Sequence, residues 1–217
     1  MIKRDLAATF SIVAYDPKNE EWGVGTASKF LAVGSMVPWA RAGVGAVATQ
    51  SWANPNYGPD GLDLLASGKK PAEVIKILTD ADPEKEIRQL AVIDAEGNTA
   101  SFTGKECMDW AGSIEGENYS VQGNILAAEA VLEDMAEQFT NSEGKLADRI
   151  TAALEAAEKA GGDKRGKQAA ALFVVKENCG INNLDDRYID LRVDDHQTPI
   201  LELKRLLNLF YEQRNDC

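Results

Sequence analysis

The chain has 217 residues, of which 44% are hydrophobic and 27% are charged, and its formal net charge is −12. This length supports one domain with a sizeable buried core, and the composition is typical of globular proteins. Nucleic-acid binding depends on clustered Lys and Arg, which are scattered here in runs of at most two, so we expect no nucleic-acid partner.

The first half of the chain is predicted to begin with strands. Segments 9–15 and 22–28 are rich in β-forming residues and flank the turn sequence DPKNEEWG, which predicts a hairpin. Residues 43–51 predict a third strand, whose small side chains suit a sheet buried on both faces. The turn-rich sequence NPNYGPDG should then lead, from about Gly61, into two short helices within residues 61–79.

The second half repeats the order of strands followed by helices. Residues 88–94 and 98–103 predict a hairpin that turns at Gly97. The remaining predicted elements are strands near 109–114 and 118–122, helices at about 127–140 and 144–160, strands at 168–176 and 186–193, and a final helix at 198–214.

This order of elements predicts the fold class. Antiparallel hairpins dominate, and the alternation of strand and helix that builds a parallel sheet is missing. We expect an α+β fold, a four-layer αββα sandwich of two mainly antiparallel sheets with helices outside. No linker-like segment divides the chain, so we expect a single domain at 9–217. We expect residues 1–8, which precede the first strand, to be a leader or propeptide.

The cysteines and the N-terminal sequence indicate the compartment. Cys107, Cys179 and Cys217 are too few and too separated to predict a disulfide framework or a CxxC metal site. The start MIKRDLAA lacks the apolar region of a signal peptide, and no segment approaches the roughly 18 apolar residues of a membrane span. We therefore expect a reduced, cytoplasmic protein with no membrane partner.

Several common catalytic arrangements do not fit the sequence. His196 is the only histidine, which argues against a Ser-His-Asp hydrolase, and the glycine-rich segments lack a phosphate-loop pattern. Cys107 has no neighbouring histidine that would activate it and is predicted to be structural. The acidic segment 185–196 is only a weak indication of a metal site. Its last residues, Asp194-Asp195-His196, are better explained as a cap for the final helix. We expect neither a metal nor a cofactor.

Thr9 offers a different chemistry. It starts the first predicted strand, directly after Ala7 and Ala8. A threonine hydroxyl needs a base, and the α-amine of an N-terminal threonine can serve because its pKa is about 7.7–8. Such an enzyme must first cleave the peptide bond before the threonine, here between Ala8 and Thr9. The alternative is an ordinary structural threonine at the start of a strand.

Long segments carry a family resemblance: ATFSIVAYD, ASKFLAVGSMVPWARAGVGAVATQSWANPNYGPDGLDLLASG, RQLAVID, SFTGKECMDWAG, YSVQGNILA, AGGDKRGKQAAAL and DDRYIDLRVDDH. On these segments, from Thr9 to about Leu207, the chain resembles the DUF1028 family. That family is similar to the N-terminal nucleophile (Ntn) hydrolases, which have the αββα fold and include self-processing amidohydrolases. The resemblance implies that Thr9 is the nucleophile. Many members begin close to the TFSIVA strand, whereas eight residues precede Thr9 here.

The resemblance also implies roles for other residues. Ser28 lies where Ntn hydrolases often carry a polar orienting residue, and Lys29 and Arg41 both resemble, by position, the basic residue that supports the nucleophile. Candidate oxyanion donors or substrate-binding residues are Asn54, Asn56, Gly123, Asn124, Asp163 and Arg165, each with turn or loop chemistry as the alternative.

Two functions remain open from the sequence. The first is an Ntn-type amidohydrolase that cleaves a C–N amide bond in a small molecule or small peptide after autoproteolysis or other removal of the leader. The second is a non-catalytic Ntn-fold binding or assembly protein that keeps the leader. A homo-oligomer is compatible with both.

Overall fold

Ten strands and five helices make up the computed structural model, which describes residues 9–214 and 217. In chain order they are β1 (Thr9–Asp16), β2 (Glu21–Ser28), β3 (Pro38–Arg41), β4 (Gly45–Ser51), α1 (Tyr57–Ala66), α2 (Pro71–Asp80), β5 (Arg88–Asp94), β6 (Thr99–Thr103), β7 (Gly112–Gly116), β8 (Tyr119–Gly123), α3 (Ala130–Asn141), α4 (Leu146–Lys159), β9 (Ala169–Val175), β10 (Arg187–Val193) and α5 (Pro199–Gln213). Short 3-10 helices lie at Val33–Ser35, Lys85–Ile87 and Ile181–Asn183.

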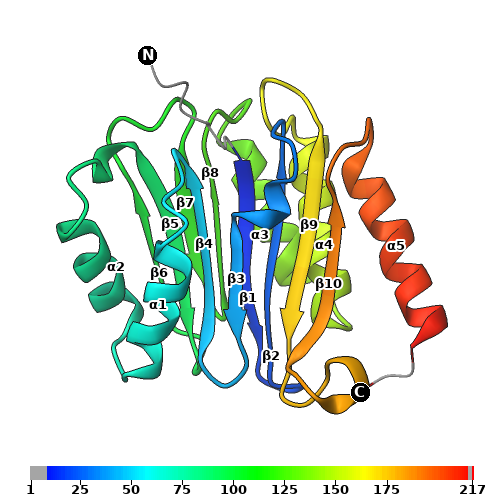
Figure 1. The fold of residues 1–217 in the computed structure, drawn as a ribbon. Helices are drawn as coiled ribbons and strands as arrows, with labels where there is room; N and C mark the ends of the chain where they lie inside the picture. Colours follow the sequence, from blue (N-terminus) through cyan, green and yellow to red (C-terminus); the bar gives the residue numbers. More distant parts are fainter. Residues whose placement is uncertain (1–8, 215–216) are drawn as a thin grey trace.

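The strands form two antiparallel sheets that pack face to face. The six-stranded sheet has the order β10-β9-β2-β1-β8-β7, and the four-stranded sheet has the order β3-β4-β5-β6. Helices α3, α4 and α5 pack outside the larger sheet, and α1 and α2 pack outside the smaller one (Figure 1). The predicted αββα sandwich is confirmed.

Alternation along the strands divides the core into layers. On β1, Phe10 and Ile12 face the helices, whereas Val13 faces the other sheet. Both faces of β1 are buried, and TFSI alternates between polar and apolar residues, whereas the following VA is apolar on both faces. The apolar layer between the sheets includes Val24 and Ile93, which are both fully buried.

Some element boundaries differ from the predictions. Strand β3 was not predicted; it is a four-residue edge strand that opens with Pro38, a position where the missing N–H costs no ladder bond. Helix α1 begins at Tyr57 and not at Gly61, because Pro59 falls in its first turn, where the helix needs no N–H. The strand predicted at 109–114 is β7, three residues later, and α3 begins at Ala130.

The cysteine prediction is wrong in one respect. Cys179 and Cys217 form a disulfide with their Cα atoms 5.7 Å apart, although 38 residues separate them in sequence. The connection between β9 and β10 returns Cys179 to the place where the chain ends after α5, which sequence spacing alone does not reveal. The chain is therefore not fully reduced, and its cytoplasmic location stays a prediction. Cys107 is free and buried.

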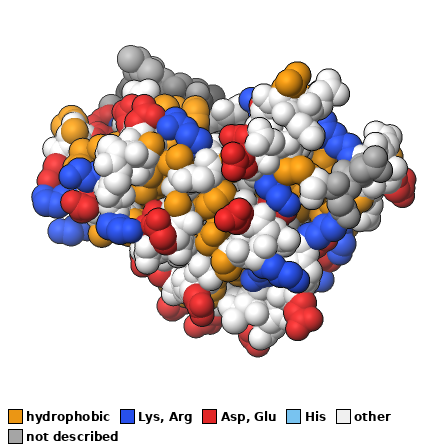
Figure 2. Space-filling model, turned by 90° about the horizontal axis from the view of Figure 1, so that it is seen from below, with side chains coloured by type: hydrophobic (Ala, Val, Ile, Leu, Met, Phe, Trp, Pro, Cys, Tyr) orange, Lys and Arg blue, Asp and Glu red, His pale blue; other side chains and the backbone are white. Residues whose placement is uncertain are grey.

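The surface shows no single dominant charge at the end of the sandwich opposite Thr9. Figure 2 shows that acidic and basic side chains are interspersed there among apolar atoms. Within the described part of the chain, none of the helices combines the length and apolar character needed to cross a membrane.

Candidate functional site

Thr9 is the first residue of β1 and is completely buried. It lies opposite Ser28 in the register of β1 and β2. On its other side, the backbone N–H of Asn124 donates a hydrogen bond of 3.1 Å to the carbonyl oxygen of Thr9. Residues opposite one another in antiparallel strands share a face, so these three side chains form a row that faces the smaller sheet.

A second polar row on the smaller sheet faces the first. Gln50, Gln89 and Thr103 lie opposite one another on β4, β5 and β6. The side-chain amide of Gln50 donates to the carbonyl oxygen of Thr9 at 3.3 Å and to Oε1 of Gln89 at 2.9 Å. Nδ2 of Asn124 also donates to Oε1 of Gln89, at 2.9 Å. These bonds join the two sheets directly beside Thr9.

The polar contacts continue one step further into the layer between the sheets. Ser11 donates to Oε1 of Gln50 at 2.6 Å and accepts from Nε2 of Gln122, also at 2.6 Å. Ser120 in turn donates to Gln122. We call the following residues the polar end: Thr9, Ser11, Ser28, Gln50, Gln89, Gln122 and Asn124. Each of them is at most 3% exposed.

The glutamines of the polar end are functional candidates that the sequence analysis missed. Gln50 stands among apolar or small residues in AVATQS, and Gln89 directly precedes the apolar run LAVI in RQLAVID. A buried amide is costly unless it is hydrogen-bonded, so a lone glutamine in a doubly buried strand is a detectable signal. The residues to which each glutamine bonds depend on how the two sheets pack, so no local sequence pattern predicts them.

The structure does not bring the ammonium of Lys29 to Thr9. Lys29 follows Ser28, so its side chain leaves on the opposite face, and Nζ donates to the carbonyl oxygen of Lys167 at 3.2 Å. Its backbone N–H donates to Oδ2 of Asp163 at 3.0 Å. Lys29 therefore helps to hold the neighbouring loop.

Asp163 and Arg165 are also engaged within that loop. Asp163 is 5% exposed and accepts bonds from the backbone N–H and the guanidinium of Arg165, the shortest at 2.7 Å. A cavity of about 50 Å³, lined in part by Phe10 and Ser28, lies beneath this loop. Phe10 faces the helices, so part of the wall of this cavity lies on the helix side of the larger sheet, whereas Ser28 is the cross-strand neighbour of Thr9.

Arg41 does not belong with Thr9, contrary to the role implied by its position in the sequence. It is exposed on β3 and forms an ion pair of 2.9 Å with Asp63. Its cross-strand neighbour is Gly45, the first residue of β4, whereas Gln50 lies near the other end of that strand. The count of residues from Thr9 does not show at which end of a strand a side chain lies.

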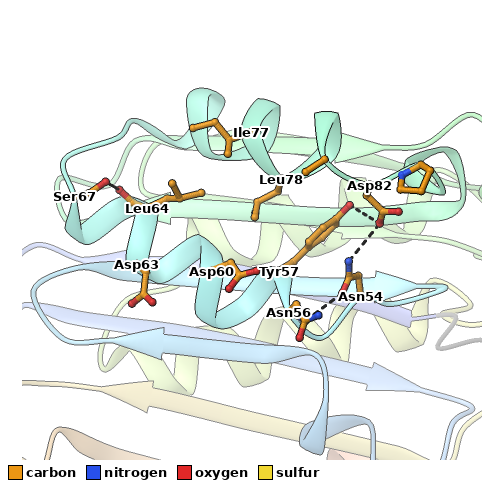
Figure 3. Close-up of a pocket in the computed structure, with 12 residues that line it drawn as sticks. Asn54, Asn56, Tyr57, Asp60, Asp63, Leu64, Ser67, Ile77, Leu78 and Asp82 are labelled. Atoms are coloured by element: carbon orange, nitrogen blue, oxygen red, sulfur yellow. Dashed lines mark hydrogen bonds between the residues drawn. The ribbon is translucent and has the colours of Figure 1, made fainter.

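Asn54 and Asn56 lie in a groove between α1 and α2 and not in the layer between the sheets. This groove has a volume of about 690 Å³ (Figure 3). Asn54 donates to Asp82 at 3.3 Å, and the backbone N–H of Asn56 donates to Oδ1 of Asn54. Tyr57 also donates to Asp82, at 2.8 Å, and Figure 3 shows both groups meeting that carboxylate. The side chain of Asn54 is thus bonded within this groove.

Asp82 is the carboxylate of this groove that accepts hydrogen bonds from Asn54, Tyr57 and Arg88. Burial alone would raise its pKa, but hydrogen bonds from Arg88, from the backbone of Glu84 and from Tyr57 outweigh burial and lower the pKa to about 2. For Tyr57, burial and the neighbouring Asp82 raise the pKa of the phenol. The carboxylate thus stays ionised and bonded to Arg88 at 2.9 Å, which fits a structural role at the rim of the groove.

The other nucleophile and metal candidates have structural roles. Burial raises the pKa of Cys107, whose thiol donates to the carbonyl oxygen of Arg88. Nδ1 of His196 accepts from the backbone N–H of Thr198, and Asp195 accepts from Gln168. Among residues 9–214 and 217, no three His, Cys, Asp or Glu side chains gather in a geometry that could hold a metal ion.

The fold and site define a class: αββα proteins whose two sheets enclose a neutral polar layer at the start of the first strand. The model of a family described as "family of unknown function (DUF1028)" matches residues 9–203, and the chain belongs to this family. It is similar to protein SPO2555 from Silicibacter pomeroyi, a DUF1028 crystal structure, with 33% sequence identity and a TM-score of 0.87, over 97% of this chain and 88% of that one. None of the curated proteins compared with the chain matches it.

Proposed function

We propose that the protein is an Ntn-type amidohydrolase in which Thr9, once it is the first residue of the mature chain, is the nucleophile. The observation that carries this proposal is the placement of Thr9 in one row with Ser28 and Asn124, inside the polar end. Two further facts support it: the fold is an αββα sandwich, and the match to the family begins at Thr9 itself. Residues 1–8 lie outside the described part of the chain.

The backbone of Thr9 is held by its carbonyl group, which is not part of the peptide bond between Ala8 and Thr9. Its carbonyl oxygen accepts from the N–H of Asn124 and from the side chain of Gln50. Cleavage between Ala8 and Thr9 breaks neither bond. The new N-terminus would therefore remain in place within the polar end, as a nucleophile that also supplies its own base requires.

The chemistry uses groups that an N-terminal threonine carries. The α-amine takes the proton of Oγ as Oγ attacks the amide carbonyl carbon, which forms a C–O bond and a tetrahedral oxyanion. The resulting ammonium gives its proton to the leaving nitrogen as the C–N bond breaks. Water, deprotonated by the same amine, then hydrolyses the ester. Ser28 is our candidate for orienting the hydroxyl of Thr9, because it is the cross-strand neighbour.

We propose a small molecule or small peptide with an amide bond as the substrate, in a cytoplasmic enzyme that needs no cofactor. Lys29 and Arg41 have no part in the proposed site, because Lys29 bonds to the loop at Lys167 and Arg41 pairs with Asp63. The base is therefore the α-amine alone.

A second candidate function is a non-catalytic binding or assembly protein that keeps residues 1–8. One observation favours it: Thr9 is fully buried, and neither of the two basic residues implied by the resemblance faces it. A protein of this kind would use the polar end only to join the sheets.

The intact mass of the purified protein, fresh and after prolonged incubation, separates the two functions. We expect the wild type and Thr9→Ser to lose residues 1–8, and Thr9→Ala to keep them. Thr26→Ala is the matched control, because Thr26 is an equally buried threonine on β2, and it should still be cleaved. Cleaved protein is then assayed on a panel of small amides. A full-length mass in every sample would reject the amidohydrolase and favour the binding protein.

A further inference from the structure

The amide groups of the polar end have one defined orientation, and Gln89 sets it. The two N–H groups of Gln89 Nε2 are shared among three acceptors, the carbonyl oxygens of Gly112 at 3.1 Å and Gly123 at 2.8 Å and Oγ1 of Thr103 at 2.9 Å. Backbone carbonyls only accept, so the nitrogen of this amide must face them. Oε1 of Gln89 must then face the opposite way, toward Gln50 and Asn124.

This orientation fixes the amide of Asn124 in turn. Asn124 has to present Nδ2 to Oε1 of Gln89, because a reversed amide would place two acceptor oxygens against each other. Its own oxygen, Oδ1, is therefore directed away from Gln89. Oδ1 is fully buried and accepts no hydrogen bond, although buried acceptors are nearly always paired.

An unpaired buried acceptor next to Thr9 indicates which chemical group the site lacks. Nδ2 of Asn124 is bonded to Gln89, and the atom of this side chain left without any partner is the acceptor oxygen Oδ1. A partner for that oxygen must carry an N–H or O–H donor. Cleavage before Thr9 would convert its peptide N–H into an amine with additional N–H donors, on the residue whose carbonyl oxygen accepts from the backbone of Asn124.

We propose that Oδ1 of Asn124 accepts a hydrogen bond from the α-amino group of cleaved Thr9, with Gln89 as the positioning residue that fixes this polarity; the inference rests on the proposed function. The neutral amine donates one N–H to Oδ1, which leaves its lone pair available for the proton of Oγ. After proton uptake, the ammonium keeps the same bond. Asn124 thus orients the base and stabilises its charged form.

The test is the titration of the α-amine in the cleaved protein. Cyanate carbamylates only the neutral amine, so the rate of mass gain at the N-terminal peptide, measured against pH, gives its pKa. An acceptor favours the ammonium, so Asn124→Ala should lower that pKa by about one unit, a tenfold change in proton affinity. Asn124→Asp, which has nearly the same shape, should raise it because its carboxylate adds a negative charge. The pH profile of amide hydrolysis should move in the same directions.

Two further variants separate the proposed role from a general weakening of the polar end. Gln89→Met frees the amide of Asn124 and should move the pKa toward that of Asn124→Ala. Ser120→Ala is the control, because Ser120 bonds to Gln122, away from Asn124, and it should leave the pKa unchanged.

The outcomes are distinct from those of the cleavage experiment. The order Asp above Asn above Ala at position 124 supports the inference. An unchanged pKa in cleaved Asn124 variants overturns it and leaves the amidohydrolase standing. Loss of cleavage in both Asn124 variants also overturns it, because the proposed role begins only after cleavage. If the wild type itself is never cleaved, the proposed function fails and this inference fails with it.

Discussion

The two ends of the layer between the sheets are built on different principles, although they share the same strands. On β5, Gln89 and Ile93 face the same way, toward the larger sheet, and both are fully buried. Around Ile93 the neighbours are apolar side chains such as Val13 and Val24, which need only to fill space. Around Gln89 every neighbour must present the correct donor or acceptor. The polar end therefore specifies orientation, whereas the apolar end supplies burial.

This difference bears on function. An apolar filling would join the sheets at lower cost, because buried amides are costly unless every group is paired. The protein nevertheless places neutral polar groups in the rows that meet at Thr9. Among the residues of the polar end, it leaves one buried side-chain acceptor, Oδ1 of Asn124, unpaired. A site that waits for a ligand or for a new amino group has this property, and a purely structural layer does not need it.

The largest effect should come from removing the residue that orients the polar end. Gln89→Leu leaves the donors of Gln50 and Asn124 and the carbonyl oxygens of Gly112 and Gly123 without their partner. Since each stranded buried group costs roughly 1–3 kcal/mol, we expect the free energy of unfolding to fall by about 4 kcal/mol. Urea denaturation followed by circular dichroism measures this change.

Thr103→Val is the matched control for that variant. It removes one acceptor of Gln89 and leaves both carbonyl oxygens bonded, so it should cost about 1 kcal/mol at most. If Gln89→Leu cost no more than this control, the polar end would not depend on directed hydrogen bonds, and the contrast with the apolar end would fail.

A change in stability of intermediate size is expected from the groove, where Asp82 and Arg88 are charged, in contrast to the neutral polar end. The pKa of Asp82 is about 2 in the folded protein, below its value of about 3.9 in an unfolded chain. A lowered folded-state pKa adds stability that is complete above about pH 5 and is lost as the pH falls through 2, about 2 kcal/mol in all.

The measurement for Asp82 is the free energy of unfolding between pH 5 and pH 2. Asp82→Asn should lose stability less steeply with acid than the wild type does over this window. Gln89→Leu should keep the slope of the wild type, because amides do not titrate there. Equal slopes for Asp82→Asn and the wild type would refute the role of Asp82.

The smallest effect is expected at the apolar end of the same strand. Ile93→Val removes one buried methyl group without stranding a polar atom, so it should cost about 1 kcal/mol. It should also leave cleavage at Thr9 unaffected. A cost as large as that of Gln89→Leu would show that packing, and not bond direction, governs both ends of the layer.

Much of the architecture follows from local patterns in the sequence. The β-forming runs and turn residues predict the β1–β2 and β5–β6 hairpins, because neighbouring strands and short turns depend on nearby residues. The same holds for the existence of the helices, whose apolar periodicity is local. Thr9 stands out because its position at the head of a strand coincides with the chemistry of an N-terminal nucleophile.

Sequence distance could not show which candidates meet in space. Lys29, Arg41, Asn54 and Asn56 were plausible by position, yet the structure directs them to a loop, to Asp63 and into the α1–α2 groove. Of the residues implied by the resemblance, Ser28 and Asn124 lie beside Thr9.

The sequence by itself determined the strands other than β3, the helices, their layering and the prominence of Thr9, since each depends on short-range periodicity and turn chemistry. Only the tertiary structure decided that Gln50 and Gln89 from the smaller sheet meet Thr9 and Asn124, and that Cys179 reaches Cys217. These contacts join residues brought together by the packing of two sheets and by the return of the chain end. The direction of each buried hydrogen bond is then fixed by carbonyl groups on yet other strands.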